Sequence, residues 1–253
     1  MSRPKLSVTV ITLNEEKDLK RCLESVRDLA DEIVVVDSGS MDKTVEIARK
    51  YGAKIYDREF DNYSNQKNYA IEKAKGDWIL SMDADEEIPP KLAKEIKSKV
   101  KSQRSKVNAY SMPRRNIILG KFIKYSRWQP EFERHVVWLF RKGRGKWVGD
   151  VHETVELDGE VGRLENAKVH YQYETVSEFM DMMDRYSELD AGQRVKNGVK
   201  FSYFRLFFDP IYNFLVRYFY RLGFLDGWRG FILSYLMAVY HLELWVKIWG
   251  RKK

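Results

Sequence analysis

The chain has 253 residues, of which 44% are hydrophobic and 32% are charged, and its formal net charge is +8. This length and apolar content predict one large α/β domain, with or without an appendage, and exclude a chain that is disordered throughout. A single cysteine, Cys22, excludes a disulfide framework and fits a reducing, cytosolic location. The first residues lack the apolar region of a secretory signal.

Strand-like and helix-like segments alternate along the first hundred residues. Strands are predicted at residues 6–13, 32–37, 54–56 and 77–82, and helices at residues 15–26, 42–51 and 64–75. This alternation predicts right-handed crossover connections and a mostly parallel sheet flanked by helices. In such sheets, ligands bind at the carboxyl ends of the strands.

Polar residues follow three of these strands at their carboxyl ends, at Thr12–Glu16, Asp37–Ser40 and Asp83–Asp85. In extended backbone, residues two apart point to the same face, so Asp83 and Asp85 can share one cation. A divalent cation held by one or two carboxylates usually completes its shell with phosphate oxygens of the substrate. Alone, the pattern is more typical of a strand followed by an acidic turn. Three polar clusters at one sheet edge favour a ligand site.

Two further polar groups belong to this half of the chain. Asp37 follows four apolar residues and precedes a turn of small residues, so its carboxylate can accept hydrogen bonds from a nucleobase or ribose. A turn that caps the next helix explains the same residues equally well. Gln66, Lys67 and Asn68 lie early in a predicted helix, a position suited to polar contacts with a nucleotide. Ordinary exposed helix polarity is the alternative.

The second half of the chain offers candidate acid–base and metal-binding groups. Glu153 follows His152, and a carboxylate opposite a metal-bound diphosphate can serve as a general base. His170 can be a further metal ligand through its neutral imidazole. For both, a purely structural role is the more common one.

The pattern of elements changes after residue 106. Short strands between glycine-rich turns are predicted at 109–112, 136–140, 154–157 and 168–173, followed by a helix at 176–192. We therefore predict a domain over residues 1–195, divided into a ligand-binding half (1–106) and a half with a small antiparallel extension (107–195). Residues 196–253 would form a separate helical segment.

The last fifty residues are dense in Phe, Tyr, Trp and Leu, but charged residues interrupt them. Residues 201–253 carry eight basic and three acidic side chains, a net charge of +5. Aromatic residues combined with Arg and Lys predict amphipathic helices that lie on a membrane surface rather than span the bilayer. Packing on the domain or on another protomer, which would make a homo-oligomer, is the alternative.

The basic net charge also raises the possibility of nucleic-acid binding. We expect no nucleic-acid partner, because the sequence lacks an RNA-binding strand motif and a basic recognition helix beside a dimerisation pattern. A non-catalytic module at a membrane surface or on nucleic acid remains the alternative to an enzyme.

Four motifs in order carry a family resemblance, and they lie at residues 10–16, 36–44, 66–70 and 77–86. They resemble the inverting family-2 glycosyltransferases of the GT-A fold, an α/β fold. Together with Val151-His152-Glu153, they are similar to a bacterial subgroup that includes lipopolysaccharide inner-core β-1,4-glucosyltransferases.

The resemblance implies a nucleotide-sugar donor, most often UDP-linked, and a glycolipid or glycan acceptor. Thr12, Asn14 and Glu15 would lie around the nucleoside, Asp37 at the base or ribose, and Lys67 and Asn68 near the nucleotide. Asp83 and Asp85 would hold ribose and metal, either Mg²⁺ or Mn²⁺. Asp85 is the surer metal ligand, with His170 as a further one.

The resemblance also predicts the catalytic base and the location of the enzyme. Family members with Glu-Asp at the base position use the second carboxylate. The dipeptide here is His-Glu, so Glu153 is the predicted base and Asp150 the second choice. The Gln/Arg-x-x-Arg-Trp motif is absent, which argues against processive polysaccharide synthesis. We expect a cytoplasmic enzyme, peripheral on the inner face of the cytoplasmic membrane, that transfers a hexose such as glucose.

Overall fold

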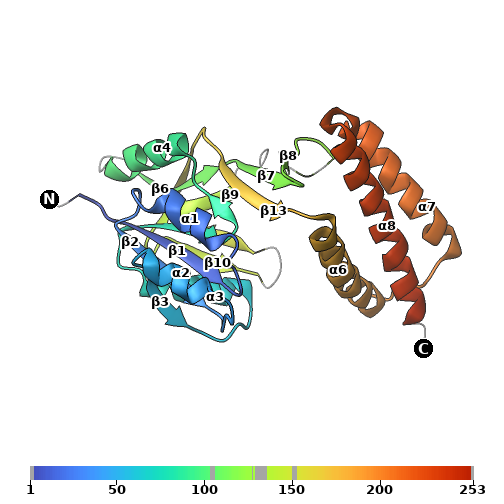
Figure 1. The fold of residues 1–253 in the computed structure, drawn as a ribbon, viewed down its shortest axis with the longest axis horizontal. Helices are drawn as coiled ribbons and strands as arrows, with labels where there is room; N and C mark the ends of the chain where they lie inside the picture. Colours follow the sequence, from blue (N-terminus) through green and yellow to red (C-terminus); the bar gives the residue numbers. More distant parts are fainter. Residues whose placement is uncertain (1–2, 103–105, 127, 129–135, 150–152, 252–253) are drawn as a thin grey trace. The chain divides into compact units, whose positions relative to one another are not determined.

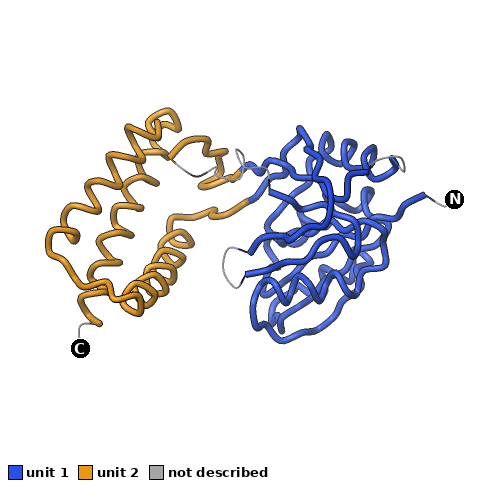
Figure 2. The backbone as a smooth tube through the Cα atoms, turned by 180° about the vertical axis from the view of Figure 1, so that it is seen from behind, with its two compact units in different colours: residues 1–115, 131–170 blue, residues 116–130, 171–253 orange. Residues whose placement is uncertain are grey.

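The computed structural model describes residues 3–102, 106–126, 128, 136–149 and 153–251. It divides the chain into two compact units (Figure 2). Unit 1 comprises residues 1–115 and 131–170, and unit 2 comprises residues 116–130 and 171–253. The predicted domain boundary at 195/196 stays a prediction. The boundaries between the two compact units lie at other positions of the chain.

Unit 1 is built on a mixed sheet with flanking helices (Figure 1). Within the described residues, seven strands of this sheet follow the order β12-β6-β9-β4-β1-β2-β3. Their bounds are β1 (Leu6–Thr12), β2 (Glu32–Asp37), β3 (Lys54–Asp57), β4 (Trp78–Asp83), β6 (Val107–Met112), β9 (Val136–Arg141) and β12 (Glu160–Arg163). The helices are α1 (Leu19–Val26), α2 (Thr44–Lys50), α3 (Tyr63–Lys73) and α4 (Pro90–Lys101).

The central strands are parallel, as their continuous apolar runs predict. β1 pairs in parallel with both β2 and β4, and all three are buried along almost their whole length. Burial on both faces explains why these strands lack the alternation of a half-exposed strand. β9 runs antiparallel to β4 and β6, which confirms the predicted change of pattern in the second half. Thr12, Asp37 and Asp83 therefore end neighbouring strands at one edge.

Short strands complete unit 1 and connect it to unit 2. β10 (Gly145–Val148) and β11 (Thr154–Leu157) form an antiparallel pair, and β5 (Glu86–Glu87) pairs with the first half of β13 (Lys168–Tyr173). β7 (Arg114–Ile118) and β13 each begin in unit 1 and end in unit 2. The chain therefore passes into unit 2 twice.

Two predicted helices begin later than the sequence indicated. The first begins at Leu19 rather than residue 15, because Asn14 has a left-handed φ of 57° and Glu15 opens a turn instead. The second begins at Thr44. Asp42 still serves its start, since its side chain accepts a hydrogen bond from the Thr44 amide at 2.9 Å.

Unit 2 is mainly helical. It contains β8 (Lys121–Phe122), α6 (Val176–Lys196), α7 (Tyr203–Leu215), a π-helical turn η1 (Val216–Tyr220), a 3₁₀ turn η2 (Gly223–Asp226) and α8 (Trp228–Gly250). α8 lies between α6 and α7 (Figure 1). Its buried Leu233 joins Phe179 and Met183 of α6 in one apolar cluster, and its Leu244 and Trp245 join Ala191 in another.

Gly230 allows the start of α8 to approach η2. A Cβ atom at Gly230 would lie 1.8 Å from the carbonyl oxygen of Gly223, whereas a Cβ at Gly192, inside α6, would lie 3.9 Å from the Arg251 guanidinium. We predict that Gly230→Ala lowers the free energy of unfolding by about 1–3 kcal/mol through overpacking. Gly192→Ala, the matched control, should raise it by up to about 1 kcal/mol. Urea denaturation measures both, and equal stability of the two variants would contradict the packing.

Candidate active site

Asp37 organises the loops after β1 and β2 instead of extending into solvent. It is 1% exposed, and its Oδ1 accepts hydrogen bonds from the hydroxyls of Thr12 (2.8 Å) and Ser40 (2.6 Å). Its Oδ2 accepts from the amides of Gly39 and Ser40 at 3.0 and 2.8 Å. Thr12 and Asp37 therefore lie together, as predicted, and fix the shape of the edge. Their contacts with a nucleotide stay a prediction.

Asn14 ties the first loop to the second. Its side-chain oxygen accepts from the Met41 amide at 2.9 Å, and its own amide donates to the Ser40 hydroxyl at 2.8 Å. The next amide, of Glu15, donates to the Thr44 hydroxyl at 2.7 Å. These contacts account for the left-handed backbone at Asn14. Glu15 therefore lies in the loop before α1 and not in the helix.

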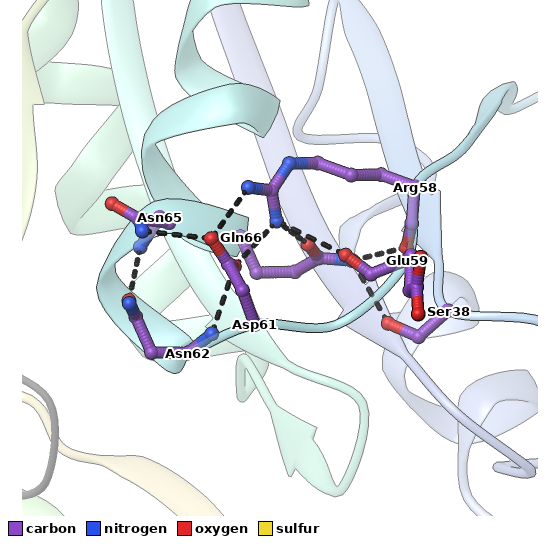
Figure 3. A network of polar contacts seen from close by, with 7 residues as sticks. All are labelled: Ser38, Arg58, Glu59, Asp61, Asn62, Asn65 and Gln66. Carbon is purple, nitrogen blue, oxygen red and sulfur yellow. Dashed lines mark hydrogen bonds and ion pairs between the residues drawn. The ribbon is translucent and has the colours of Figure 1, made fainter.

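A polar network that the sequence did not indicate supports the same edge between β3 and α3 (Figure 3). The guanidinium of Arg58 bonds both carboxylate oxygens of Asp61, at 2.8 and 3.0 Å, and also contacts Gln66. The Gln66 side chain is fully buried, and its Nε2 donates to the Ser38 hydroxyl at 2.8 Å. Gln66 of the Gln-Lys-Asn block thus binds protein groups. No sequence periodicity marks Arg58 for this role.

Lys67 joins two predicted site residues from distant parts of the chain. Its Nζ lies 2.9 Å from Oδ1 of Asp83 and 2.8 Å from Oε1 of Glu153, and its side chain is 2% exposed. Burial disfavours the charged form of the Lys67 amine. The negative charges of Asp83 and Glu153 outweigh this effect and raise the pKa of Lys67 above its usual value. The same pairing, helped by Lys168, overcomes the burial of Asp83 and holds its pKa below the usual range. Both Lys67 and Asp83 are therefore charged at neutral pH.

Aromatic side chains shield Lys67 from water. Its ammonium lies 4.6 Å from the ring centroid of Trp147 and 5.6 Å from that of Trp138. The neighbouring Asn68 holds β10 in place, because its side-chain oxygen accepts from the Trp147 amide (3.0 Å) and its nitrogen donates to the Trp147 carbonyl (2.9 Å). Asn68 thus supports the wall of the site, and a direct contact with a nucleotide stays a prediction.

Asp85 and His170 form the second pair. Nε2 of His170 lies 2.9 Å from Oδ2 of Asp85, and the side chains are 12% and 29% exposed respectively. The other oxygen of Asp85, Oδ1, is buried and has no hydrogen-bond partner within the described part of the chain. A buried carboxylate oxygen without a partner, beside an imidazole, fits a divalent cation.

The described residues do not form a complete protein metal site. Among them, no three His, Cys, Asp or Glu side chains are grouped closely enough to hold an ion alone. Asp85 and His170 offer two ligands, and phosphate oxygens of a substrate would have to supply others. The predicted participation of Asp83 stays a prediction, since its Oδ1 is bound to Lys67.

A buried ion pair that we did not predict underlies the Asp83–Asp85 turn. Lys168 and Glu86 are both fully buried and 2.5 Å apart, and the other oxygen of Glu86 accepts from the Asp83 amide at 3.0 Å. Burial lowers the pKa of Lys168 to about 8 in spite of Glu86. In the sequence, only the alternation of side chains along β13 indicates that Lys168 belongs to the site, because it places residues 168 and 170 on the same face of the strand.

Asp150 and His152 lie outside the described residues. Glu153 itself is described and is 17% exposed, so its position beside Lys67 and Asp83 is the structural basis for its predicted role. The site therefore contains two pairings of predicted residues: Lys67 with Asp83 and Glu153, and Asp85 with His170.

A family model described as glycosyl transferase family 2 matches residues 7–151, more than half of the chain. The chain belongs to glycosyltransferase family 2. This glycosyltransferase is 31% identical to the lipopolysaccharide core biosynthesis glycosyltransferase LpsC of Rhizobium meliloti, over 97% of this chain and 92% of that one. It is also 31% identical to an uncharacterized glycosyltransferase of Rickettsia typhi, over 92% of this chain and 83% of that one.

The fold of the glycosyltransferase has a counterpart among solved structures. A crystal structure of residues 1–349 of TarS from S. aureus matches with a TM-score of 0.50 and 16% identity, over 93% of this chain and 81% of that one. The predicted GT-A fold class is confirmed by the family match and by the mixed sheet with flanking helices. The predicted family membership is confirmed as well.

The pKa of Glu15 yields a test of the site's electrostatics. Burial and then the charges of Asp85, Asp18 and Asp83 raise it from 4.5 to about 8. The native state therefore holds a proton that the unfolded chain releases between these values, so Glu15 lowers stability progressively as pH rises from about 4.5 to 8. We predict that Glu15→Gln matches the wild type at pH 4 and exceeds its free energy of unfolding by about 1–3 kcal/mol at pH 9.

Urea denaturation in metal-free buffer across pH 4–9 would measure this difference. The control variant is Glu24→Gln, which removes a carboxylate from the exposed face of α1. A gap between Glu15→Gln and the wild type that stays constant over the whole range would contradict the raised pKa.

Proposed function

We propose that this enzyme transfers a hexose, glucose being the best candidate, from a UDP-linked sugar to a hydroxyl group with inversion of the anomeric configuration. The acceptor would be the lipopolysaccharide core or another cell-surface glycan or glycolipid. One observation carries the proposal: Glu153 and Asp83 meet at Lys67, while Asp85, on the turn after β4, pairs with His170 of β13. The named activity of the LpsC relative supports the choice of acceptor.

Asp85 and His170 would hold a divalent cation, Mg²⁺ or Mn²⁺. The partnerless Oδ1 of Asp85 and the neighbouring imidazole are suitable ligands. Such an ion supplies positive charge against the leaving diphosphate. Asp37 and the Asn14–Met41 contact give the nucleotide-binding edge a fixed shape before the donor arrives.

Glu153 would act as the general base. Its carboxylate takes the proton of the acceptor hydroxyl while that oxygen forms a bond to the anomeric carbon, and the bond from this carbon to the diphosphate oxygen breaks. A single displacement of this kind inverts the configuration, as in inverting hydrolysis. Lys67 holds the carboxylate in position, and Trp147 and Trp138 exclude water from the ammonium.

The C-terminal residues 201–253 would keep the enzyme on the inner face of the cytoplasmic membrane. By length and composition alone α8 could span a membrane, but 39% of its most apolar stretch is buried within the protein. Peripheral contact agrees better with this burial than a crossing of the bilayer. A glycolipid acceptor at the same surface would then lie within reach.

Removal of the proposed base should abolish turnover without abolishing donor binding. A positioned base contributes roughly 10²–10⁴-fold, so Glu153→Gln should lose at least about 100-fold in kcat. The matched control is Glu156→Gln, an exposed carboxylate in β11. Turnover is measured as UDP release with acceptor, and donor affinity by calorimetry. Wild-type turnover in Glu153→Gln would remove the residue from this role.

Loss of the proposed metal ligand should act on the donor instead. Asp85→Asn is expected to weaken Mn²⁺-dependent binding of a UDP-sugar by at least about tenfold, because the amide is a poorer ligand than the carboxylate. Asp77→Asn, at the opposite end of β4, is the control. Calorimetric titration with and without Mn²⁺ gives both affinities. An unchanged metal dependence in Asp85→Asn would contradict the assignment.

A further inference from the structure

α7 exposes its apolar side chains to solvent, whereas a surface helix of a soluble protein packs them on the core. The structure describes α7 along its whole length, and none of its thirteen residues is buried. Seven of them are large apolar or aromatic side chains that are 47–70% exposed: Tyr203, Phe204, Phe207, Phe208, Ile211, Tyr212 and Leu215. A surface helix of a soluble protein normally turns such residues inward.

A polar residue of α7, Asp209, turns toward α8 instead. Oδ2 of Asp209 accepts a hydrogen bond at 2.7 Å from Nε1 of Trp245, which is fully buried. Asn213 donates to the main chain of Asp209 at 2.8 Å. The Asp209–Trp245 hydrogen bond thus fixes this side of α7 against α8 and leaves the aromatic residues on the outer side.

The exposed surface continues from α7 across η1 to α8. Tyr218 of η1 packs edge-on against Phe231 of α8 with ring centroids 5.5 Å apart, and Phe231 also meets Phe214 at 5.7 Å. Phe219 and Tyr220 are 55% and 74% exposed. α8 adds an exposed stripe at positions three, four or seven residues apart: Trp228, Phe231, Tyr235, Leu242, Val246 and Trp249. A contiguous apolar surface of this kind marks an interaction site.

The charges around this aromatic surface identify its partner. Residues 201–253 carry three acidic side chains, and each is bound within unit 2: Asp209 to Trp245, Asp226 to the amides of Lys124 and Tyr125, and Glu243 to Lys247. Arg205 and Arg221 are exposed, and the Arg221 guanidinium lies 5.5 Å from the ring of exposed Tyr220. The solvent side of this segment is therefore aromatic and cationic.

We propose that the outer face of α7, with η1 and the exposed stripe of α8, inserts into the interface of an anionic lipid bilayer. The proposal rests on the peripheral membrane contact of the proposed function and centres it on α7, because the more apolar α8 packs between two helices and contributes only its exposed stripe. Phe and Ile side chains enter the acyl boundary, Tyr and Trp stay at the headgroups, and Arg205 and Arg221 meet lipid phosphates. A second copy of the chain would bring two cationic surfaces together.

A single fluorescent label tests the insertion in the full-length protein. Cys22, the only native cysteine, is fully buried, so a cysteine introduced at an exposed position can be labelled selectively. Phe207→Cys on α7 and Leu189→Cys on α6 start from similar exposures, 68% and 63%. With an environment-sensitive dye and vesicles of phosphatidylcholine and phosphatidylglycerol (3:1), we expect a blue shift at position 207 alone. An equal shift at both positions, or none at 207, would overturn the proposal.

Surface substitutions measure the contribution of the same face to affinity. Combined Phe204→Ser, Phe207→Ser and Ile211→Ser should reduce binding to these vesicles at least about tenfold in flotation assays, while Tyr186→Ser with Leu189→Ser on α6 should leave it unchanged. Vesicles of pure phosphatidylcholine should bind the wild type more weakly. Near-ultraviolet circular dichroism verifies that both variants remain folded, and equal vesicle binding by the two variants would refute insertion by α7.

Light scattering and donor binding separate the other outcomes. A wild-type dimer that becomes monomeric in the α7 variant, without vesicle binding by either, would show that the face joins two copies and would overturn the lipid assignment. Thermal shift with UDP-glucose and Mn²⁺ reports on the active site independently. Vesicle binding without any donor response would refute the proposed function while the membrane assignment stands.

Discussion

The arrangement of the candidate active site depends on one buried lysine ammonium that lies between two carboxylates. Lys67 comes from α3, Asp83 from the end of β4 and Glu153 from the residue before β11, so one ammonium group joins three separate segments of unit 1. Removing a lysine ammonium from water is costly, and only close opposite charges offset that cost. Loss of either carboxylate would leave the buried ammonium with a single charged partner, so the three positions constrain one another.

Much of the fold could be predicted because burial leaves a simple pattern. β1, β2 and β4 are continuous apolar runs since both their faces are covered, and the polar residues at their ends follow from the parallel topology. The bounds of β11 and β13 agree with the predicted ones to the residue. Asp83, Asp85 and Glu153 were also singled out from sequence, through motifs whose spacing is local or carried by the family resemblance, and their roles stay predictions.

The remaining features depend on contacts between residues far apart in the chain. The sequence shows Lys67 as one polar residue among several in a helix, and nothing local reveals that it is 2% exposed and paired with Glu153, 86 residues later. Lys168 and Glu86 are equally ordinary in sequence, yet they form a fully buried pair beneath the aspartate turn. The division into compact units depends on such contacts as well, because unit 2 combines two segments separated by forty residues of unit 1.

This discontinuity has a consequence for synthesis on the ribosome. Residues 116–130 emerge early, but the partners of Ile118 and Ile123 are Phe179, Met183 and Leu233, which emerge much later. Unit 2 therefore cannot assemble until nearly the whole polypeptide has been translated, and the β7–β8 hairpin must wait with its apolar side chains uncovered. Such nascent chains are prone to aggregate. A premature stop within α8 would remove helix residues on which the early hairpin and α6 both depend, even though the whole of unit 1 precedes the stop.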